Sequence, residues 1–301
     1  MSLSALFKAV RAPFFTGVIV PTVLGAALAW HSGYAIHWGY FFLTLFGIIF
    51  IHAGANTIND YFDHRSQNDD LNENFVRPFS GGSRVIQQNG LSGKGMLIYS
   101  LTLYLIGIIV GLILAYTRGL PILWIGLIGV AIGVFYVMPG INLAGRGFGE
   151  AGIFVSFGTL CVVGSYYVQA QVLNPEPFFV SIPVGLLITA VLWINEFPDF
   201  EADKQVGKTH WVIRLGKRNA SRVYFALMLV TYISIITLAA FYNIWLLLGA
   251  LTLPISLKIS LNAMKNYANT PALIPSNAGT IQAHLLTGLL LSCGYVVDKL
   301  V

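Results

Sequence analysis

The sequence is poor in charged residues and in cysteine. Only 10% of its 301 residues are charged, whereas soluble globular domains carry about 25%. The two cysteines, Cys161 and Cys293, both fall in apolar runs, which argues against a disulfide framework or a cysteine metal cluster. A hydrophobic content of 56% and a mean hydropathy of +0.74 leave too little polar surface for a water-soluble chain. Composition therefore predicts an integral membrane protein.

Long apolar runs account for most of the chain. A membrane-spanning helix needs roughly 20 predominantly apolar residues, and nine runs qualify: about 14–31, 40–62, 97–116, 120–138, 148–171, 178–197, 222–241, 244–262 and 280–298. These runs are too long and too unalternating for a membrane β-barrel. We expect an all-α polytopic fold, with nine transmembrane helices around a central cavity. Residues 1–301 would form one domain with loops at about 63–96 and 199–221.

Positive charge is distributed unequally between the two sets of loops. Of the 17 Lys and Arg residues, 15 fall at the N-terminus or in loops on the same side, and only Arg118 and Lys299 fall on the other side. The positive-inside rule therefore places the N-terminus in the cytoplasm and the C-terminus outside. The net charge of +5 reflects these loops, so it calls for no nucleic-acid partner.

Acidic residues are concentrated in two segments that resemble each other. Nine of the 12 acids lie within 60–73 or 196–203. Residues 58–63 read I-N-D-Y-F-D and residues 194–199 read I-N-E-F-P-D, and each segment ends an expected membrane helix on the cytoplasmic side. Four expected helices separate the copies, so the repeat would be parallel.

The polar residues of both segments recur at helical spacing. Successive polar residues are three or four positions apart in each segment. In the first segment they are Asn56, Asn59 or Asp60, and Asp63. In the second they are Asn195 or Glu196, Asp199 and Asp203. Residues so spaced share one helix face. Several carboxylates facing one cavity would repel each other, and a divalent cation removes that repulsion. Oxygen ligands without a Cys or His cluster favour Mg²⁺.

Basic residues in the same loops suggest what the metal would hold. Lys and Arg side chains are suited to phosphate, and the segments carry Arg77, Arg84, Lys94, Lys204 and Lys208. The helices behind them are apolar and aromatic. A diphosphate with a long hydrocarbon tail would fit both environments.

Two longer motifs carry a specific resemblance. N-D-Y-F-D-H-R-S-Q-N-D (59–69) and N-E-F-P-D-F-E-A-D-K-Q-V-G-K-T (195–209) resemble the signature motifs of the UbiA superfamily of intramembrane prenyltransferases. R-P-F-S-G-G-S-R-V-I (77–86), G-R-G-F-G-E (145–150) and P-S-N-A-G-T-I-Q-A-H (275–284) extend the resemblance over nearly the whole chain.

The resemblance implies a site and a reaction. Family members bind Mg²⁺ and a polyprenyl diphosphate through residues that match Asn59, Asp63, Asp199 and Asp203. Asp60, Asp69 and Asn195 would complete the metal site, and Asn56, Asn59, Arg77, Arg84, Lys94, Lys208 and Arg146 would bind the diphosphate. Many members place another Asp four residues after Asp63, where this chain has Gln67, and Asp69 follows two residues later. This spacing is similar to the branch that prenylates 1,4-dihydroxy-2-naphthoate to give demethylmenaquinone.

The expected chemistry needs no enzyme nucleophile. Mg²⁺ would make the diphosphate a better leaving group, and Lys208 would stabilise the developing charge beside Asp63 and Asp199. Aromatic faces would protect the allylic cation, for which Tyr136, Tyr166 and Tyr167 are candidates. An aromatic acceptor then attacks.

Other interpretations stay open at this stage. The acceptor could be 4-hydroxybenzoate, homogentisate or a lipid or porphyrin alcohol. Acids within helices also serve cation-coupled transporters, although those sites usually lie near the midplane. Individually, the Asp and Asn residues could be helix caps and the loop lysines could only set topology. We expect a bacterial or archaeal cytoplasmic membrane, membrane lipid around the helices, and an active site facing the cytoplasm.

Overall fold

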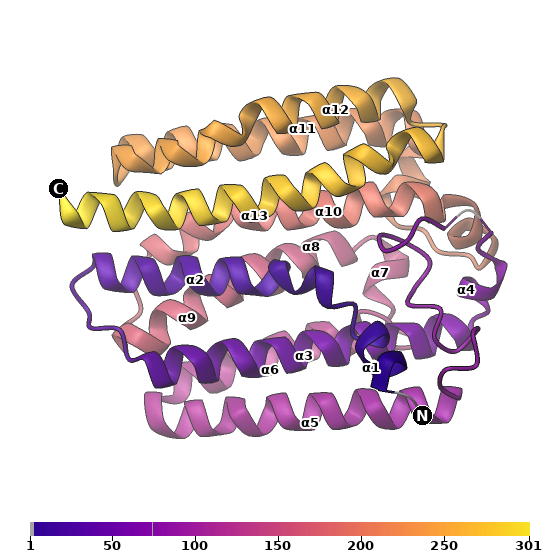
Figure 1. The fold of residues 1–301 in the computed structure, drawn as a ribbon, viewed down its shortest axis with the longest axis horizontal. Helices are drawn as coiled ribbons and strands as arrows, with labels where there is room; N and C mark the ends of the chain where they lie inside the picture. The colour runs from indigo at the N-terminus through magenta and orange to yellow at the C-terminus, as the bar shows by residue number, and fades with distance from the viewer. Residues whose placement is uncertain (1–2, 74) are drawn as a thin grey trace.

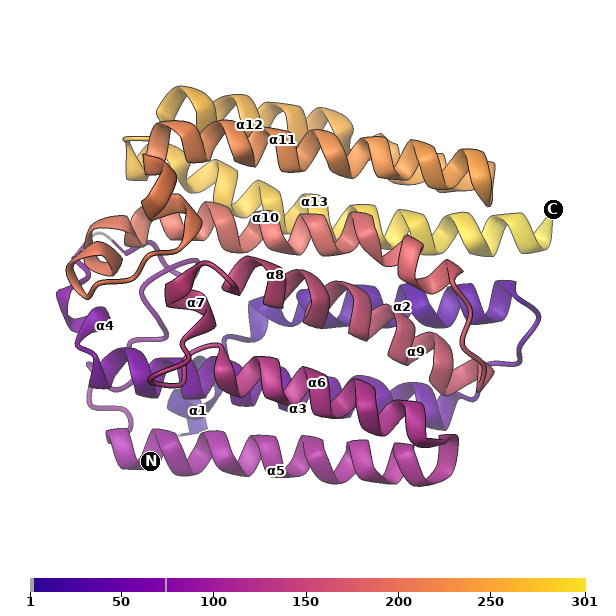
Figure 2. The ribbon, with the colours of Figure 1, turned by 180° about the vertical axis from the view of Figure 1, so that it is seen from behind.

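The computed structural model describes residues 3–73 and 75–301. Long helices lie side by side along one axis of the molecule (Figures 1 and 2). Within the described residues, eight helical segments are long and apolar enough to cross a membrane. They are η1 and α2 (Ala12–Phe15, Thr16–His31), α3 (Trp38–Arg65), α5 (Gly93–Arg118), α8, η2 and α9 (Gly149–Ile153, Phe154–Leu160, Cys161–Ala170), α10 (Glu176–Gln205), α11 (Trp211–Phe241), η3 and α12 (Ile244–Thr252, Leu253–Asn266), and α13 (Thr270–Leu300). The all-helical membrane architecture is confirmed.

The segment expected at 120–138 differs in length from the others. It forms α6 (Leu120–Phe135), an apolar helix of 16 residues. At 1.5 Å per residue such a helix is about 24 Å long, which is shorter than the roughly 30 Å hydrocarbon layer of a bilayer. Gly119 and Pro121 bound its start, and the chain leaves it at Tyr136.

Two clusters of buried apolar side chains form the main core of the bundle. Leu24 and Leu28 of α2 are fully buried with Ile235 of α11 and Tyr295 of α13. A second cluster surrounds Phe197 of α10. On the outside, α5 exposes apolar side chains along one face. The exposed fractions of Leu101, Leu105 and Leu112 are 57%, 58% and 52%. Such a face is compatible with lipid and not with water.

The helix that runs from Gly149 to Ala170 contains a π-helical stretch, η2. There the backbone of Gly158 lies so close to α10 that an added Cβ would be 2.6 Å from the Cα of Gly185. A side chain at position 158 would push against the backbone of α10, whereas one at position 185 would meet the Phe154 ring at 2.9 Å. The π-helical geometry and the two glycines therefore fix the distance between η2 and α10.

The short helices gather at one end of the bundle. Figure 1 shows α1 (Leu3–Ala9), α4 (Asn68–Leu71) and α7 (Leu143–Arg146) at the end opposite the C-terminus. In the region of the loop expected at about 199–221, α10 continues to Gln205, and the helix that begins at Trp211 is interrupted by a kink at Gly216, whose φ is +72°. Pro198 lies inside α10 without ending it, as buried membrane helices allow.

Candidate active site

A polar cavity of about 210 Å³ lies between the two Asp-rich segments. It is lined by Asn56, Asn59 and Asp63 of α3, by Asn195, Asp199 and Asp203 of α10, and by Asp69, Gly81, Gly82, Tyr136 and Lys208 from the connections. The structure thus brings the two sequence copies, which are 136 residues apart, to one cavity at the end of the bundle.

The acids of α10 are held by hydrogen bonds from the connections. Asp199 Oδ1 accepts from Asn72 Nδ2 at 2.6 Å, and its Oδ2 accepts from the Gly81 backbone N–H at 3.4 Å. Asp203 Oδ1 accepts from Asn68 Nδ2 at 2.9 Å and lies 2.8 Å from Lys208 Nζ. These contacts fold the α3–α5 connection back against α10.

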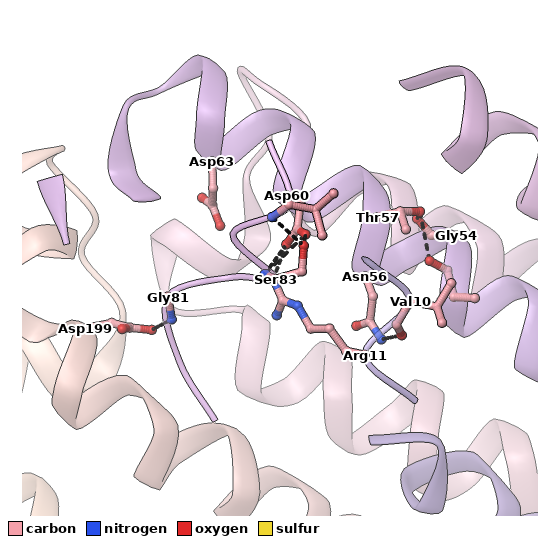
Figure 3. A network of polar contacts seen from close by, with 12 residues as sticks. Val10, Arg11, Gly54, Asn56, Thr57, Asp60, Asp63, Gly81, Ser83 and Asp199 are labelled. Carbon is pink, nitrogen blue, oxygen red and sulfur yellow. Dashed lines mark hydrogen bonds and ion pairs between the residues drawn. The ribbon is translucent and has the colours of Figure 1, made fainter. Parts of the chain in front are cut away.

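The residues of α3 divide between the cavity and a buried ion pair. Asp63 faces the cavity, where Lys208 Nζ is 3.5 Å from its Oδ1. Asp60, which was predicted as a metal ligand, pairs instead with the Arg11 guanidinium and accepts hydrogen bonds from the side chain and backbone of Ser83. Figure 3 shows Asp60 turned toward these two residues, while Asp63 points away from them. Asp60 is therefore already satisfied by protein donors.

Asp69 enters the cavity from α4 and not from α3. Burial, followed by the nearby carboxylates of Asp63 and Asp60, raises the pKa of Asp69 to about 8. An added Cβ at Gly82 would lie 2.4 Å from Asp69 Oδ2, and Gly82 has a φ of +68°. Only glycine combines that backbone conformation with room for the carboxylate.

Lys208 links the two segments electrostatically. Burial lowers the pKa of Lys208, but the carboxylates of Asp63 and Asp203 outweigh burial and raise it above the ordinary value. The ammonium group is therefore charged at neutral pH. It stands between an acid of α3 and an acid of α10.

Several predicted phosphate contacts lie away from the cavity. Arg77, Lys94 and Arg146 are exposed and do not contribute to its described lining. The Arg84 side chain donates to the Asp69 carbonyl and stacks over Phe75, with 4.4 Å from its Cζ to the ring centroid. Arg11 does line the cavity. The loop-charge pattern identified Arg11 only as a topological signal, because nothing in its spacing shows that η1 returns to α3.

Of the three tyrosines predicted to protect the allylic cation, one lies at the polar cavity and two lie elsewhere. Tyr136 lines the cavity. Tyr166 is fully buried and packs against Tyr34 of the α2–α3 connection, with ring centroids 6.3 Å apart. Tyr167 belongs to an apolar cluster with Leu114 and Ile122. Tyr166 and Tyr167 therefore stabilise the opposite end of the bundle.

His210 is among the polar lining residues that the sequence pattern missed. His210 is buried, and its Nε2 is 3.1 Å from Asp203 Oδ2 while its Nδ1 is 3.3 Å from Glu196 Oε2. Burial lowers the pKa of His210, yet the nearby carboxylates of Asp203 and Glu196 raise it to about 10. A lone histidine in a loop gave no signal of this contact before the loop's fold was known.

A second cavity, of about 270 Å³, lies between α3, α5, α6 and α9. Its described lining is almost wholly apolar and includes glycines of α5 and α6, among them Gly111 and Gly126. His52 and Phe157 line both cavities, and their rings meet edge to face with centroids 4.7 Å apart. The polar cavity therefore adjoins an apolar one across these two side chains.

Comparison with known proteins assigns the fold and the family. Residues 18–274 match the UbiA prenyltransferase family. A solved UbiA homolog from Archaeoglobus fulgidus, bound to DMAPP and Mg²⁺, superimposes with a TM-score of 0.69 over 95% of this chain and 99% of that chain, at 14% identity. At that identity the match establishes the shared fold.

Curated relatives are similar over almost their whole length. The 1,4-dihydroxy-2-naphthoate octaprenyltransferase of Bacillus subtilis is 26% identical, covering 97% of this chain and 92% of the relative. The enzyme of the same name from Escherichia coli is 28% identical, covering 92% and 90%. A 2-carboxy-1,4-naphthoquinone phytyltransferase from Synechocystis is 27% identical, covering 95% and 91%. The chain belongs to the UbiA prenyltransferase family and is an integral membrane enzyme that transfers polyprenyl groups.

Proposed function

We propose that this enzyme transfers a polyprenyl group from its diphosphate to 1,4-dihydroxy-2-naphthoate in a Mg²⁺-dependent reaction. The new C–C bond forms as the prenyl C–O bond breaks and diphosphate leaves, the ring loses its carboxylate as CO₂, and the product is demethylmenaquinone in its reduced, quinol form. One observation carries the proposal. The cavity lined by two facing sets of acids adjoins an apolar cavity at His52 and Phe157. A charged head and a hydrocarbon tail would each find a matching environment on either side of that junction.

The donor atoms of the polar cavity fit a divalent cation with a preference for oxygen. Asp63 and Asp69 supply carboxylates from one side, and Asp199 and Asp203 supply them from the other. Asn59 Oδ1 is buried and accepts no hydrogen bond from residues 3–73 or 75–301. Buried polar atoms are normally satisfied, so this oxygen is available as a ligand. When bound, Mg²⁺ neutralises the diphosphate and improves it as a leaving group.

Protein groups would bind and orient the diphosphate beside that metal. Lys208 and Arg11 both line the cavity, and they approach it from the α10–α11 connection and from the N-terminus respectively. Both would donate to phosphate oxygens as charge develops on them. Tyr136 presents an aromatic ring to the same cavity, where its face would stabilise the allylic cation.

The apolar cavity would hold the start of the prenyl chain. Gly111 and Gly126 lie on its wall, and an added Cβ at either would meet nothing within 4 Å. Their missing side chains leave room for hydrocarbon. Gly126→Leu should reduce transfer from long prenyl diphosphates by about tenfold relative to short ones, whereas Gly39→Leu, also in open space but outside this wall, should not.

The choice of acceptor rests on the relatives. Two of them, from B. subtilis and E. coli, are named for 1,4-dihydroxy-2-naphthoate, and the motif spacing around Gln67 and Asp69 resembles the same branch. The UbiA homolog of A. fulgidus is bound to DMAPP and Mg²⁺, which supports the same class of donor and metal for this chain.

The proposal includes a topology. Both Asp-rich segments line the cavity, and the loop count assigns 15 of the 17 Lys and Arg residues to the same end as these segments. That end would face the cytoplasm of a bacterial or archaeal cell, with nine spans and the C-terminus outside. The 301 residues would act as one domain.

An acceptor panel tests the proposal directly. Purified protein receives a radiolabelled polyprenyl diphosphate, Mg²⁺ and, separately, 1,4-dihydroxy-2-naphthoate, 4-hydroxybenzoate or homogentisate. We expect lipid-soluble product with the naphthoate and none after chelation of Mg²⁺. Product with another acceptor alone would reject the naphthoate assignment. Ion flux in proteoliposomes with no product from any acceptor would favour the transporter interpretation.

A further inference from the structure

Three buried side chains meet beside the polar cavity, outside the predicted metal ligands. Glu150 comes from the first turn of α8, Glu196 from α10, and His210 from the residue that precedes α11. One ligand atom of each lies within 4.8 Å of the other two. The three elements are far apart in sequence, so the cluster depends on the tertiary fold.

Each residue of this cluster has one buried atom that makes no hydrogen bond in the described part of the chain. Glu150 Oε1 accepts from the Trp211 backbone N–H at 3.2 Å, but its Oε2 is buried and has no partner in the described part of the chain. Glu196 Oε2 and His210 Nδ1 are 3.3 Å apart and likewise form no well-aligned hydrogen bond there. Each of the three residues thus keeps a potential ligand atom that is not used in a hydrogen bond.

Protonation of His210 alone does not satisfy this arrangement. An imidazolium has two N–H donors. Its Nε2–H is directed at Asp203, 3.1 Å away, so only Nδ1–H remains for the cluster. That donor can serve Glu196, but Glu150 Oε2 would stay buried without a partner. An uncompensated buried carboxylate is costly.

We propose that Glu150, Glu196 and His210 bind a divalent transition metal such as Zn²⁺, at a site separate from the Asp-rich Mg²⁺ site. One imidazole nitrogen with carboxylate oxygens is a ligand set for Zn²⁺ or Mn²⁺, whereas Mg²⁺ prefers oxygen alone. Ligand atoms within 4.8 Å of one another are compatible with one ion between them.

The surroundings of His210 support this assignment. Histidines that bind metals usually donate their other ring N–H to a carboxylate, which fixes the ring and makes the free nitrogen more basic. Asp203 occupies that place at Nε2. Glu196 and His210 also line the polar cavity, so the remaining coordination positions of the ion would face it. The metal would tie the starts of α8 and α11 to α10.

Cobalt provides a direct probe of this site. Full-length protein in detergent is stripped with a chelator, saturated with Mg²⁺ to fill the oxygen site, and titrated with Co²⁺ while visible absorbance is recorded. We expect a Co²⁺ absorbance that excess Mg²⁺ does not displace. No substrate is present, so failure of this site leaves the proposed prenyl transfer untouched.

Matched variants localise the signal. His210→Gln and Glu150→Gln should each weaken Co²⁺ binding at least about tenfold, while Asp63→Asn and Glu176→Gln should retain it. Glu176 is a suitable control because its carboxylate accepts from the Tyr295 hydroxyl at the far end of the bundle. Complete displacement of Co²⁺ by Mg²⁺, or unchanged binding in Glu150→Gln, would overturn the proposal. If His210→Gln does not fold, the Glu150→Gln result decides.

Discussion

The two Asp-rich segments have nearly the same sequence but are used differently. In both, the Asn and the following Asp face the cavity: Asn59 and Asp63 on α3, Asn195 and Asp199 on α10. The acid between them differs. Asp60 is held in an ion pair with Arg11, whereas its counterpart Glu196 faces the cavity and meets His210. A sequence repeat therefore fixes which positions share a helix face, while the neighbouring elements decide what each middle acid contacts.

The segments diverge again where each helix ends. α10 runs to Gln205, so Asp203 stays on the same helix face as Asp199. α3 ends at Arg65, and Gln67, the counterpart of Asp203, takes a left-handed φ of 61°. The chain turns there and α4 brings Asp69 into the cavity instead. The missing Asp at position 67 is thus replaced by one from a separate turn.

The largest effect should come from the positions that the two segments share. Asp63→Ala and Asp199→Ala should each reduce prenyl transfer by about 10³-fold or more, because both carboxylates would hold the metal that stabilises the leaving group. The measurement is kcat/KM with radiolabelled donor. Asp298→Ala, at the other end of the bundle beside His31, should stay near wild-type activity. An active Asp63→Ala variant would reject the shared metal role.

Lys208 tests whether the segments act as one site, since it contacts an acid of each. Lys208→Gln should lower kcat by about 10²-fold, the usual cost of losing one preorganised donor. Lys204→Gln is the matched control, because Lys204 is exposed and lies four residues earlier. Equal activity of the two variants would show that Lys208 only neutralises its neighbours.

Substitutions of the two middle acids, Asp60 and Glu196, should differ in how much they destabilise the protein. Asp60→Asn leaves the partly buried Arg11 guanidinium without its buried carboxylate, and breaking such a pair costs up to about 3 kcal/mol. In protein stripped of metal by a chelator, Glu196→Gln loses only the contact to His210 and should unfold at a denaturant concentration closer to that of wild type. Denaturant unfolding in detergent provides the comparison. Similar destabilisation in both variants would contradict the division between them.

The smallest effect concerns the turn that serves only the first segment. Gly82→Ala forces a side chain into positive φ and against Asp69. Gly207→Ala imposes a similar φ, +78°, with nothing within 4 Å of the new Cβ. Both should cost about 1 kcal/mol of stability, but only Gly82→Ala should also lower kcat, by about tenfold. A parallel loss of kcat in both would trace the effect to backbone strain alone.

The spacing of residues along the sequence predicted the features that depend on one helix alone. The 3.6-residue period placed Asn59 with Asp63, and Asn195 with Asp199, and the long apolar runs predicted the membrane helices. Contacts made by returning loops were not predictable from spacing. Arg11 reaches Asp60 from the N-terminus, and His210 reaches Asp203 from a short connection. Motif position also predicted contacts that the described residues do not make. The side chains of Arg77, Lys94 and Arg146 were expected to bind diphosphate, but they are not in the described lining of the cavity.

The π-helical stretch Phe154–Leu160 gives this helix a place where chain length can change at little cost to the site. A π-helix accommodates an additional residue within an otherwise α-helical rod. Deleting one residue there would let the stretch tighten to α-helical geometry, so the turn that carries Glu150 would keep nearly the same orientation relative to α9. A change in length at this point would therefore alter the packing against α10 while leaving the polar group beside the cavity in place.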